Sequence, residues 1–145
     1  VQSRQQLMTA IVQAIVGAMR RDPKRPDAEV GLKTPSIHSD LLWTLHSNNN
    51  IAEALRRFGV SRTTRSLILV RVAPPLDAGE LVQHMTQLVD GTLQTRGLSL
   101  PSPALAWSEL GTAYKIQDTP AFQHPDTSQV DALICSMVAS KYVGA

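Results

Sequence analysis

The amino-acid sequence predicts a mixed α/β fold of the α+β class, in which the helices of a helix-rich domain pack on a small central β-sheet. Most segments repeat their apolar residues at spacings of three and four, which is the period of an amphipathic helix. One run, Ser66–Val72, is rich in apolar and β-branched residues, as is typical of a buried strand. Aromatic residues make up only 4% of the chain, so aliphatic side chains must form the core. We expect residues 1–145 to form a single domain, because 145 residues is an ordinary domain length.

The first predicted helix covers residues 4–21. Its apolar residues recur along one wide face, made of Leu7, Met8, Ile11, Val12, Ile15, Ala18 and Met19. The following segment, residues 22–31, contains two prolines and alternating charges. This composition predicts a flexible surface loop.

A second helix is predicted over residues 36–46. Thr34 is the expected N-cap, and Pro35 suits the first helical position because its missing N–H has no partner there in any helix. A strand in this segment is the alternative, but the apolar stripe has the helical period: Ile37, Leu41, Leu42 and Leu45.

A third helix is predicted over residues 51–58, after a polar break at Ser47–Asn50. Asn50 can cap its first turn, and Glu53 stands at the position that completes a capping box. Gly59 is expected to end the helix in a left-handed conformation.

Residues 66–72 are the predicted central strand, which Pro74 and Pro75 end. Asp77 and Glu80 then form a second expected capping box, opening a helix that Gly91 closes. We expect the buried face of this helix to contain Leu81, Val82, Met85, Leu88 and Val89.

The last third of the chain predicts one short strand and two helices. Residues 92–102 have a mixed pattern that favours a short or edge strand, and a helix is expected from Pro103 toward Ile116. A proline-rich loop at residues 117–125 precedes a final helix capped within Asp126–Ser128. Its expected inward side chains are Val130, Leu133, Ile134, Met137 and Val138.

The sequence offers no arrangement suited to catalysis, and we expect no metal or cofactor. The four histidines are scattered, and neither a Gly-x-Ser-x-Gly elbow nor a phosphate-binding glycine loop occurs. Cys135 is the only cysteine, and its place on the last helix favours a buried small residue over a nucleophile. The most apolar stretch, Leu67–Val70, is far shorter than a membrane span.

Basic and polar residues concentrate between positions 48 and 65, although the net charge is only +2. The asparagine turn leads into a helix N-terminus, where free N–H groups favour anions. Arg56 and Arg57 follow on that helix, and Lys33 precedes it. The alternative is an ordinary solvated face, in which Glu53 and Arg57 pair at i,i+4 and the asparagines are simple turn residues.

Several segments resemble the TPRKB family, the kinase-binding subunit of the EKC/KEOPS complex. The most specific are Ser36–Leu42 and Leu45–Ser61, and the strand Leu67–Val72 follows them at the distance found in the family. Tyr114–Ile116 and Leu133–Met137 resemble later family motifs. Two features depart from the pattern: the N-terminal strand region is missing, and residues 92–102 match poorly. The loops at residues 22–31 and 117–125 are longer than minimal, as in fungal members.

The resemblance implies a non-catalytic subunit that binds the small atypical kinase of EKC/KEOPS and, through it, the threonylcarbamoyl-transferase subunit. It also implies that the subunit helps to recruit tRNA by its 3′ CCA end, for modification of the adenosine beside the anticodon. Roles in telomere maintenance and transcription, and a location in nucleus and cytoplasm, are implied in the same way.

The resemblance also assigns provisional roles to individual residues. The expected RNA-binding residues are Asn48, Asn49, Asn50, Ile51, Arg56, Arg57 and Lys33, since amides and an apolar platform can hold bases while cations hold phosphates. Trp43 is either a partner-binding anchor or plain core. The alternative function is a stand-alone RNA- or DNA-binding module, and a small hydrolase or transferase is a weaker third reading.

Overall fold

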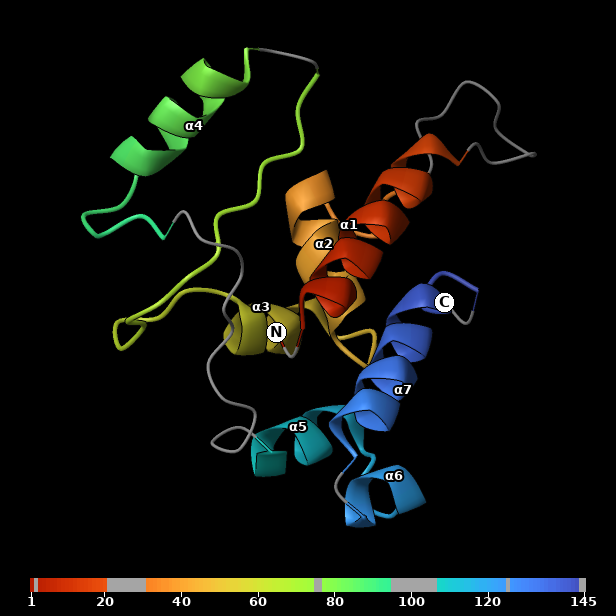
Figure 1. Cartoon of the computed structure of the whole chain (residues 1–145). Helices are drawn as coiled ribbons and strands as arrows, with labels where there is room; N and C mark the ends of the chain where they lie inside the picture. The colour runs from red at the N-terminus through yellow and green to blue at the C-terminus, as the bar shows by residue number, and fades with distance from the viewer. Residues whose placement is uncertain (2, 21–30, 75–76, 95–106, 125, 144–145) are drawn as a thin grey trace.

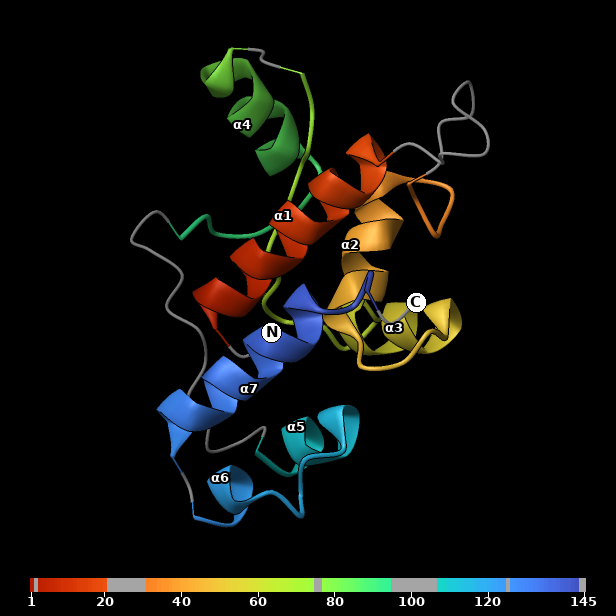
Figure 2. The same ribbon diagram turned by 90° about the vertical axis from the view of Figure 1, so that its right-hand side faces the viewer.

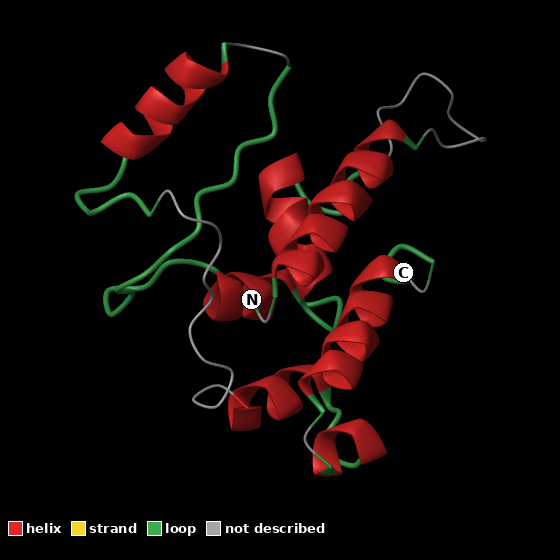
Figure 3. Cartoon of the chain, viewed as in Figure 1, coloured by secondary structure: helices red, strands yellow, loops and turns green. Residues whose placement is uncertain are grey.

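The computed structural model describes residues 1, 3–20, 31–74, 77–94, 107–124 and 126–143. Helices and loops make up these ranges, as Figures 1 and 3 show. The helices are α1 (Arg4–Met19), α2 (Ile37–Leu45), α3 (Ile51–Phe58), α4 (Ala78–Gln87), α5 (Trp107–Tyr114), α6 (Pro120–Gln123) and α7 (Thr127–Ala139). The prediction of a helix-rich chain is therefore confirmed.

The predicted α+β fold is wrong for the described residues, because they contain no β-strand. Residues 66–72 run as extended chain, and Leu67, Ile68 and Leu69 are each 38% exposed. An apolar β-branched run forms a strand only where a second strand supplies its hydrogen bonds, and no such partner lies among the described residues. Instead, the Val72 N–H donates to Nε2 of His38 at 3.1 Å.

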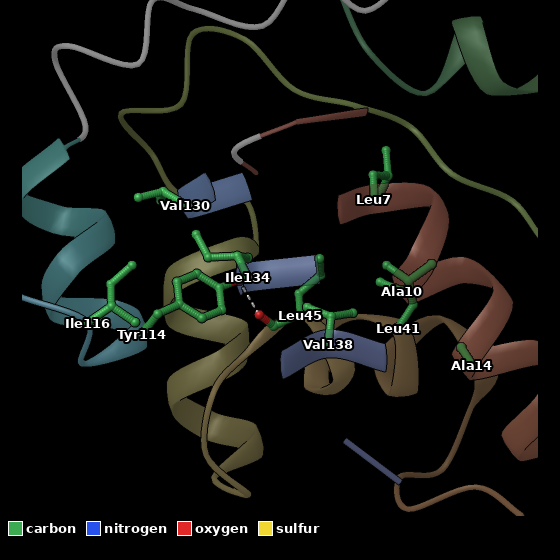
Figure 4. Close-up of a cluster of buried hydrophobic side chains, with 10 residues drawn as sticks. All are labelled: Leu7, Ala10, Ala14, Leu41, Leu45, Tyr114, Ile116, Val130, Ile134 and Val138. Atoms are coloured by element: carbon green, nitrogen blue, oxygen red, sulfur yellow. Dashed lines mark hydrogen bonds between the residues drawn. The ribbon is translucent and has the colours of Figure 1, made fainter. Parts of the chain in front are cut away.

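The core lies where α1, α2 and α7 pack together, and the views in Figures 1 and 2 both place α2 and α7 against α1. Figure 4 shows its buried side chains, which come from these helices, from α5 and from Ile116 just after α5. They are Leu7, Ala10, Ala14, Leu41, Leu45, Tyr114, Ile116, Val130, Ile134 and Val138. Each large aliphatic side chain buried there stabilises the fold by about 2 kcal/mol.

The first helix forms where it was predicted, but its buried face is narrower than the apolar pattern indicated. Met8, Val12 and Met19 are 47%, 50% and 76% exposed, so placing them inside was wrong. The inward face consists of Gln6 and Leu7, followed by the small residues Ala10, Ala14 and Gly17. Small side chains let α2 and α7 approach α1 closely. The contact is therefore narrow, and the outer side chains of the predicted apolar face remain exposed to solvent.

Side-chain caps fix the helix starts, and most agree with prediction. Asn50 caps α3 by accepting the Glu53 N–H at 3.2 Å, and Asp126 caps α7 by accepting the N–H groups of Ser128 and Gln129. The predicted Thr34 cap of α2 is wrong, since Ser36 is the N-cap and forms a capping box with Ser39. The reason is that the helix begins at Ile37, two residues later than a helix capped by Thr34 would.

Two predicted details of the helix ends also need correction. Gly59 follows α3 at φ −78°, which is not left-handed. A Cβ there would stand 2.3 Å from the Leu55 carbonyl oxygen, so close backbone approach explains this glycine. The predicted loop at 117–125 contains the short helix α6, which begins with Pro120 in its first turn and packs on α7.

The helix predicted after Asp77 forms as α4, and Asp77 caps it by accepting the Gly79 and Glu80 N–H groups. Its apolar face was expected to be buried, but α4 has no buried residue, and Val82 is 52% exposed. Figures 1 and 2 show α4 standing apart from the helices of the core. Residues 92–94 form no strand, and the rest of the strand predicted at 92–102 lies outside the described residues, as does the start of the helix expected from Pro103.

Candidate functional site

The candidate site is the polar loop that joins α2 to α3, and its three asparagines, Asn48–Asn50, are exposed. Two of their side chains stabilise the loop itself: Oδ1 of Asn48 accepts the Asn50 N–H at 2.9 Å, and Asn50 caps α3. The Asn49 side-chain amide has no hydrogen bond to any described residue. Asn49 therefore presents a free amide donor and acceptor beside the N-terminus of α3.

Groups beneath the loop hold its backbone from three directions. The Trp43 indole N–H donates to the Asn49 carbonyl at 3.3 Å, and Nδ1 of His46 accepts the Asn48 N–H at 3.1 Å. From the turn after α7, the Lys141 ammonium donates to the carbonyls of His46, at 2.7 Å, and of Asn48. The loop conformation is thus set by the end of α2 and by the C-terminal turn.

The two titratable groups under the loop both have shifted pKa values. Burial lowers the pKa of His46, and the nearby charges of Arg57 and Lys141 lower it further. His46 is therefore neutral near pH 7, which leaves Nδ1 free to accept a hydrogen bond. Burial lowers the pKa of Lys141 to about 8, so most of its ammonium is still charged at neutral pH.

Charge on α3 is partly neutralised within the helix. Glu53 accepts two hydrogen bonds from Arg56, at 2.9 and 2.5 Å, and one from Arg57 at 2.8 Å. The bonds from Arg56, and then those from Arg57, lower the pKa of Glu53 to about 2. The alternative expectation of a Glu53–Arg57 pair is confirmed, and the two guanidinium groups with one carboxylate leave a net charge of +1 on this exposed face.

The other predicted site residues lie in different surroundings. Ile51 is half-buried at the first position of α3. Lys33 is exposed and precedes the N-terminus of α2, whereas the asparagine loop follows the C-terminus of this nine-residue helix, which is about 13 Å long. The structure therefore brings the asparagines, Ile51 and the arginines together but leaves Lys33 apart.

Trp43 is only 4% exposed, so its ring belongs to the interior of this structure. Its face lies 4.6 Å from the Lys141 ammonium, and its ring packs edge-on against Tyr142 at 5.4 Å. These contacts support the loop from below. A role for Trp43 in partner binding remains a prediction.

Lys141 is the residue at this site that the sequence did not reveal. It stands 93 positions after Asn48, and a lysine just beyond a C-terminal helix has the pattern of an ordinary surface residue. No spacing or motif links it to the loop. Only the packing of α7 against α1 brings the C-terminal turn under the end of α2.

Neither a metal-binding cluster nor a membrane-spanning helix is found in the part of the chain that the structure describes. These residues contain no group of three His, Cys, Asp or Glu side chains that could hold a metal ion. The Cys135 thiol is buried, and burial raises its pKa, which confirms the expected small interior residue. No described helix is both long and apolar enough to cross a membrane.

The fold and the site define a class of protein: a small helical domain that presents a polar loop beside a charged helix. The sequence model of the family described as "Kinase binding protein CGI-121" matches residues 1–142. The chain therefore belongs to this family, and the resemblance noted from its sequence motifs is confirmed.

Three relatives illustrate the similarity, and each is named "EKC/KEOPS complex subunit CGI121". The one from Gibberella zeae is 35% identical over 96 residues, which cover 61% of this chain and 44% of the relative. Those from Yarrowia lipolytica and Cryptococcus neoformans are 40% and 31% identical, covering 46% and 77% of this chain and 35% and 48% of the relative. The matches thus span less than half of each relative. No solved structure matches this chain.

Proposed function

We propose that this chain is part of a non-catalytic subunit of an EKC/KEOPS complex, which binds the small atypical kinase of that complex and, through it, the transferase. The observation that supports this most strongly is the family match over residues 1–142, together with the complex that appears in the names of the relatives.

We further propose that the Asn48–Asn50 loop and α3 help to hold the 3′ CCA end of tRNA. Unpaired nucleotides are held by amides that read base edges and by cations that neutralise phosphates. The loop presents the free Asn49 amide, while α3 supplies a helix N-terminus and the exposed Arg56. Tighter, independent nucleic-acid binding is disfavoured because the net charge is +2 and Glu53 offsets one guanidinium.

Roles in telomere maintenance and transcription, and a location in nucleus and cytoplasm, are further parts of this proposal. They would follow from membership of the complex and not from any feature of the described residues. Their test is therefore the same as the test of membership.

Affinity purification of the tagged full-length protein from its own cells tests membership of the complex. We expect a small atypical kinase and a threonylcarbamoyl-transferase subunit to be recovered with it. Recovery of RNA without either protein would favour the stand-alone RNA- or DNA-binding module and overturn the proposal.

Binding of tRNA, with and without its CCA end, tests the proposed RNA site. Arg56→Ala/Arg57→Ala should weaken binding several-fold and reduce the salt dependence by up to about two units, because two phosphate contacts are lost. The control is Arg62→Ala/Arg65→Ala, which removes the same charge from exposed residues beyond α3. Equal effects of the two double variants, or equal binding of tRNA that lacks CCA, would contradict the assignment.

A further inference from the structure

Lys141 is a buried cation placed directly beneath the asparagine loop. It lies in the turn after α7 and is only 8% exposed. Its ammonium donates to the His46 and Asn48 carbonyls and stands over the face of Trp43. An ammonium has three donors and no acceptor, so two carbonyls and an aromatic face satisfy it almost completely.

No carboxylate of the described residues neutralises the charge of this ammonium. Among the described residues, the ion pairs join Glu53 to the two arginines of α3, and no carboxylate pairs with Lys141. A buried lysine usually has such a partner, since an ammonium loses much hydration energy on burial. The positive field of Lys141 therefore reaches the loop above it through the low-dielectric interior and is screened by solvent beyond the loop surface.

We propose that Lys141 is the positioning residue of the RNA-binding loop, which it holds in the conformation that exposes the Asn49 amide while drawing RNA phosphate toward it. The inference rests on the proposed RNA binding. It adds Lys141 as a residue of that site and explains how this residue would act. The preferred ligand is a single-stranded nucleic-acid end, whose phosphates approach the loop while a base contacts the amide.

A purely structural role is the competing explanation. The carbonyls bound by Lys141 lie at and just beyond the C-terminus of α2, where a cation stabilises a helix through its dipole. Such a role needs the two N–H donors, but a neutral amine also has two. The two explanations therefore differ in what happens when Lys141 loses its proton.

The groups around Lys141 allow this proton to be followed by pH. Its pKa is lowered to about 8, whereas the pKa of His46 lies below its usual value and that of Glu53 is about 2. The pKa of Tyr142 is raised by burial and by its bond to Asp40. Arg57 is a further cation at this site, and its charge acts on His46. Between about pH 7 and pH 9, Lys141 is thus the group at this site that changes charge.

The experiment measures the affinity of the full-length protein for a short single-stranded RNA ending in CCA and built only of A and C, bases that do not titrate in this range. We expect wild-type affinity to fall several-fold between about pH 7 and pH 9. Lys141→Arg should remove this dependence, because arginine stays charged. Unchanged affinity of the wild type across the range would overturn the proposed role of the charge.

Lys141→Met tests the positioning role at about pH 7. We expect affinity to fall on the order of tenfold, and amide hydrogen exchange at Asn48–Asn50 to accelerate, because the two carbonyls lose their donor. Lys115→Met is the control, since it removes an exposed lysine elsewhere. If Lys141→Met fails to fold, the pH profiles of wild type and Lys141→Arg still decide whether the charge of Lys141 contributes to RNA binding.

The outcomes also separate this inference from the function on which it rests. If the wild type does not bind the CCA-ended RNA at all, the proposed RNA-binding function fails. If the wild type binds and Lys141→Met binds equally well, only the role of Lys141 fails.

Discussion

Tyr142 donates its hydroxyl to Oδ2 of Asp40, a fully buried carboxylate on α2. The other carboxylate oxygen accepts the N–H groups of Lys33 and Thr34, at 2.9 and 2.8 Å. Burial and the bond to Asp40 raise the pKa of Tyr142, so its phenol remains a donor. This pair ties the C-terminal turn, α2 and the segment before α2 into one hydrogen-bonded unit.

Tyr142→Phe should lower the free energy of unfolding by about 1.5–3 kcal/mol, because a buried carboxylate loses one of its donors. Urea denaturation at neutral pH measures the change. Removal of an exposed hydroxyl by Thr112→Ala on α5 is the control and should change stability by less than about 0.5 kcal/mol. An unchanged urea midpoint for Tyr142→Phe would show that the Tyr142–Asp40 hydrogen bond contributes nothing to the free energy of unfolding.

Gly17→Ala should destabilise the protein, although alanine is normally the better helix former by about 1 kcal/mol. A Cβ at Gly17 would stand 2.4 Å from the Tyr142 ring, and Asp40 holds that ring in place. We expect the melting temperature to fall by several degrees.

A second background tests whether this contact causes the loss. In a Tyr142→Ala protein the ring is absent, so Gly17→Ala should have no cost there and should raise the melting temperature slightly. An increase in stability from Gly17→Ala in the wild type would refute the close contact.

The elements that sequence analysis located well are those fixed by local interactions. The helix Ile51–Phe58 was predicted with both its ends, because Asn50 caps it and one apolar face repeats along it. The Glu53–Arg57 ion pair on this helix could also be predicted, because the two residues stand four positions apart. Such features depend on residues within one or two turns of each other.

The features that were missed depend on contacts distant in sequence. Ser66–Val72 has the composition of a strand, but a strand exists only through a partner that its own sequence does not specify. The burial of Lys141 beneath Asn48 likewise depends on how α7 packs against α1. The exposed asparagines and arginines could therefore be predicted, whereas the group that supports them could not.

Acidification should loosen the asparagine loop through His46. The folded protein lowers the pKa of His46 below its ordinary 6.5, so the unfolded chain binds the proton more readily. The stabilisation from neutral His46 is complete above about pH 6.5 and is lost as pH falls through the lower folded value. Protonation also removes the acceptor for the Asn48 N–H.

The stability of wild type and His46→Gln between about pH 7.5 and pH 5 measures this effect. The variant should lose less stability on acidification than the wild type. His84→Gln, at an exposed histidine of α4, should behave as the wild type does. If His46→Gln and the wild type followed the same curve, His46 would not be the sensitive group.

Glu53→Gln should tighten RNA binding, although it breaks the ion pairs on α3. The carboxylate holds Arg56 and Arg57 against the helix, so its removal frees both guanidinium groups and raises the charge of this face by one. We expect a several-fold gain in affinity for CCA-ended RNA that shrinks as salt rises, since the gain is electrostatic. Glu109→Gln on α5 makes the same change of net charge at a distant exposed position and should have a smaller effect.

The same variant has an acid signature, because the Arg56 and then the Arg57 bonds lower the pKa of Glu53 to about 2. The stabilisation from this depressed pKa is complete above the ordinary value of 4.5 and is lost as pH falls through about 2. Glu53→Gln should therefore be less stable than the wild type at neutral pH, and this difference should vanish in acid.

Weaker RNA binding by Glu53→Gln at low salt would mean that the ordered Glu53–arginine arrangement, and not free charge, is what the RNA recognises.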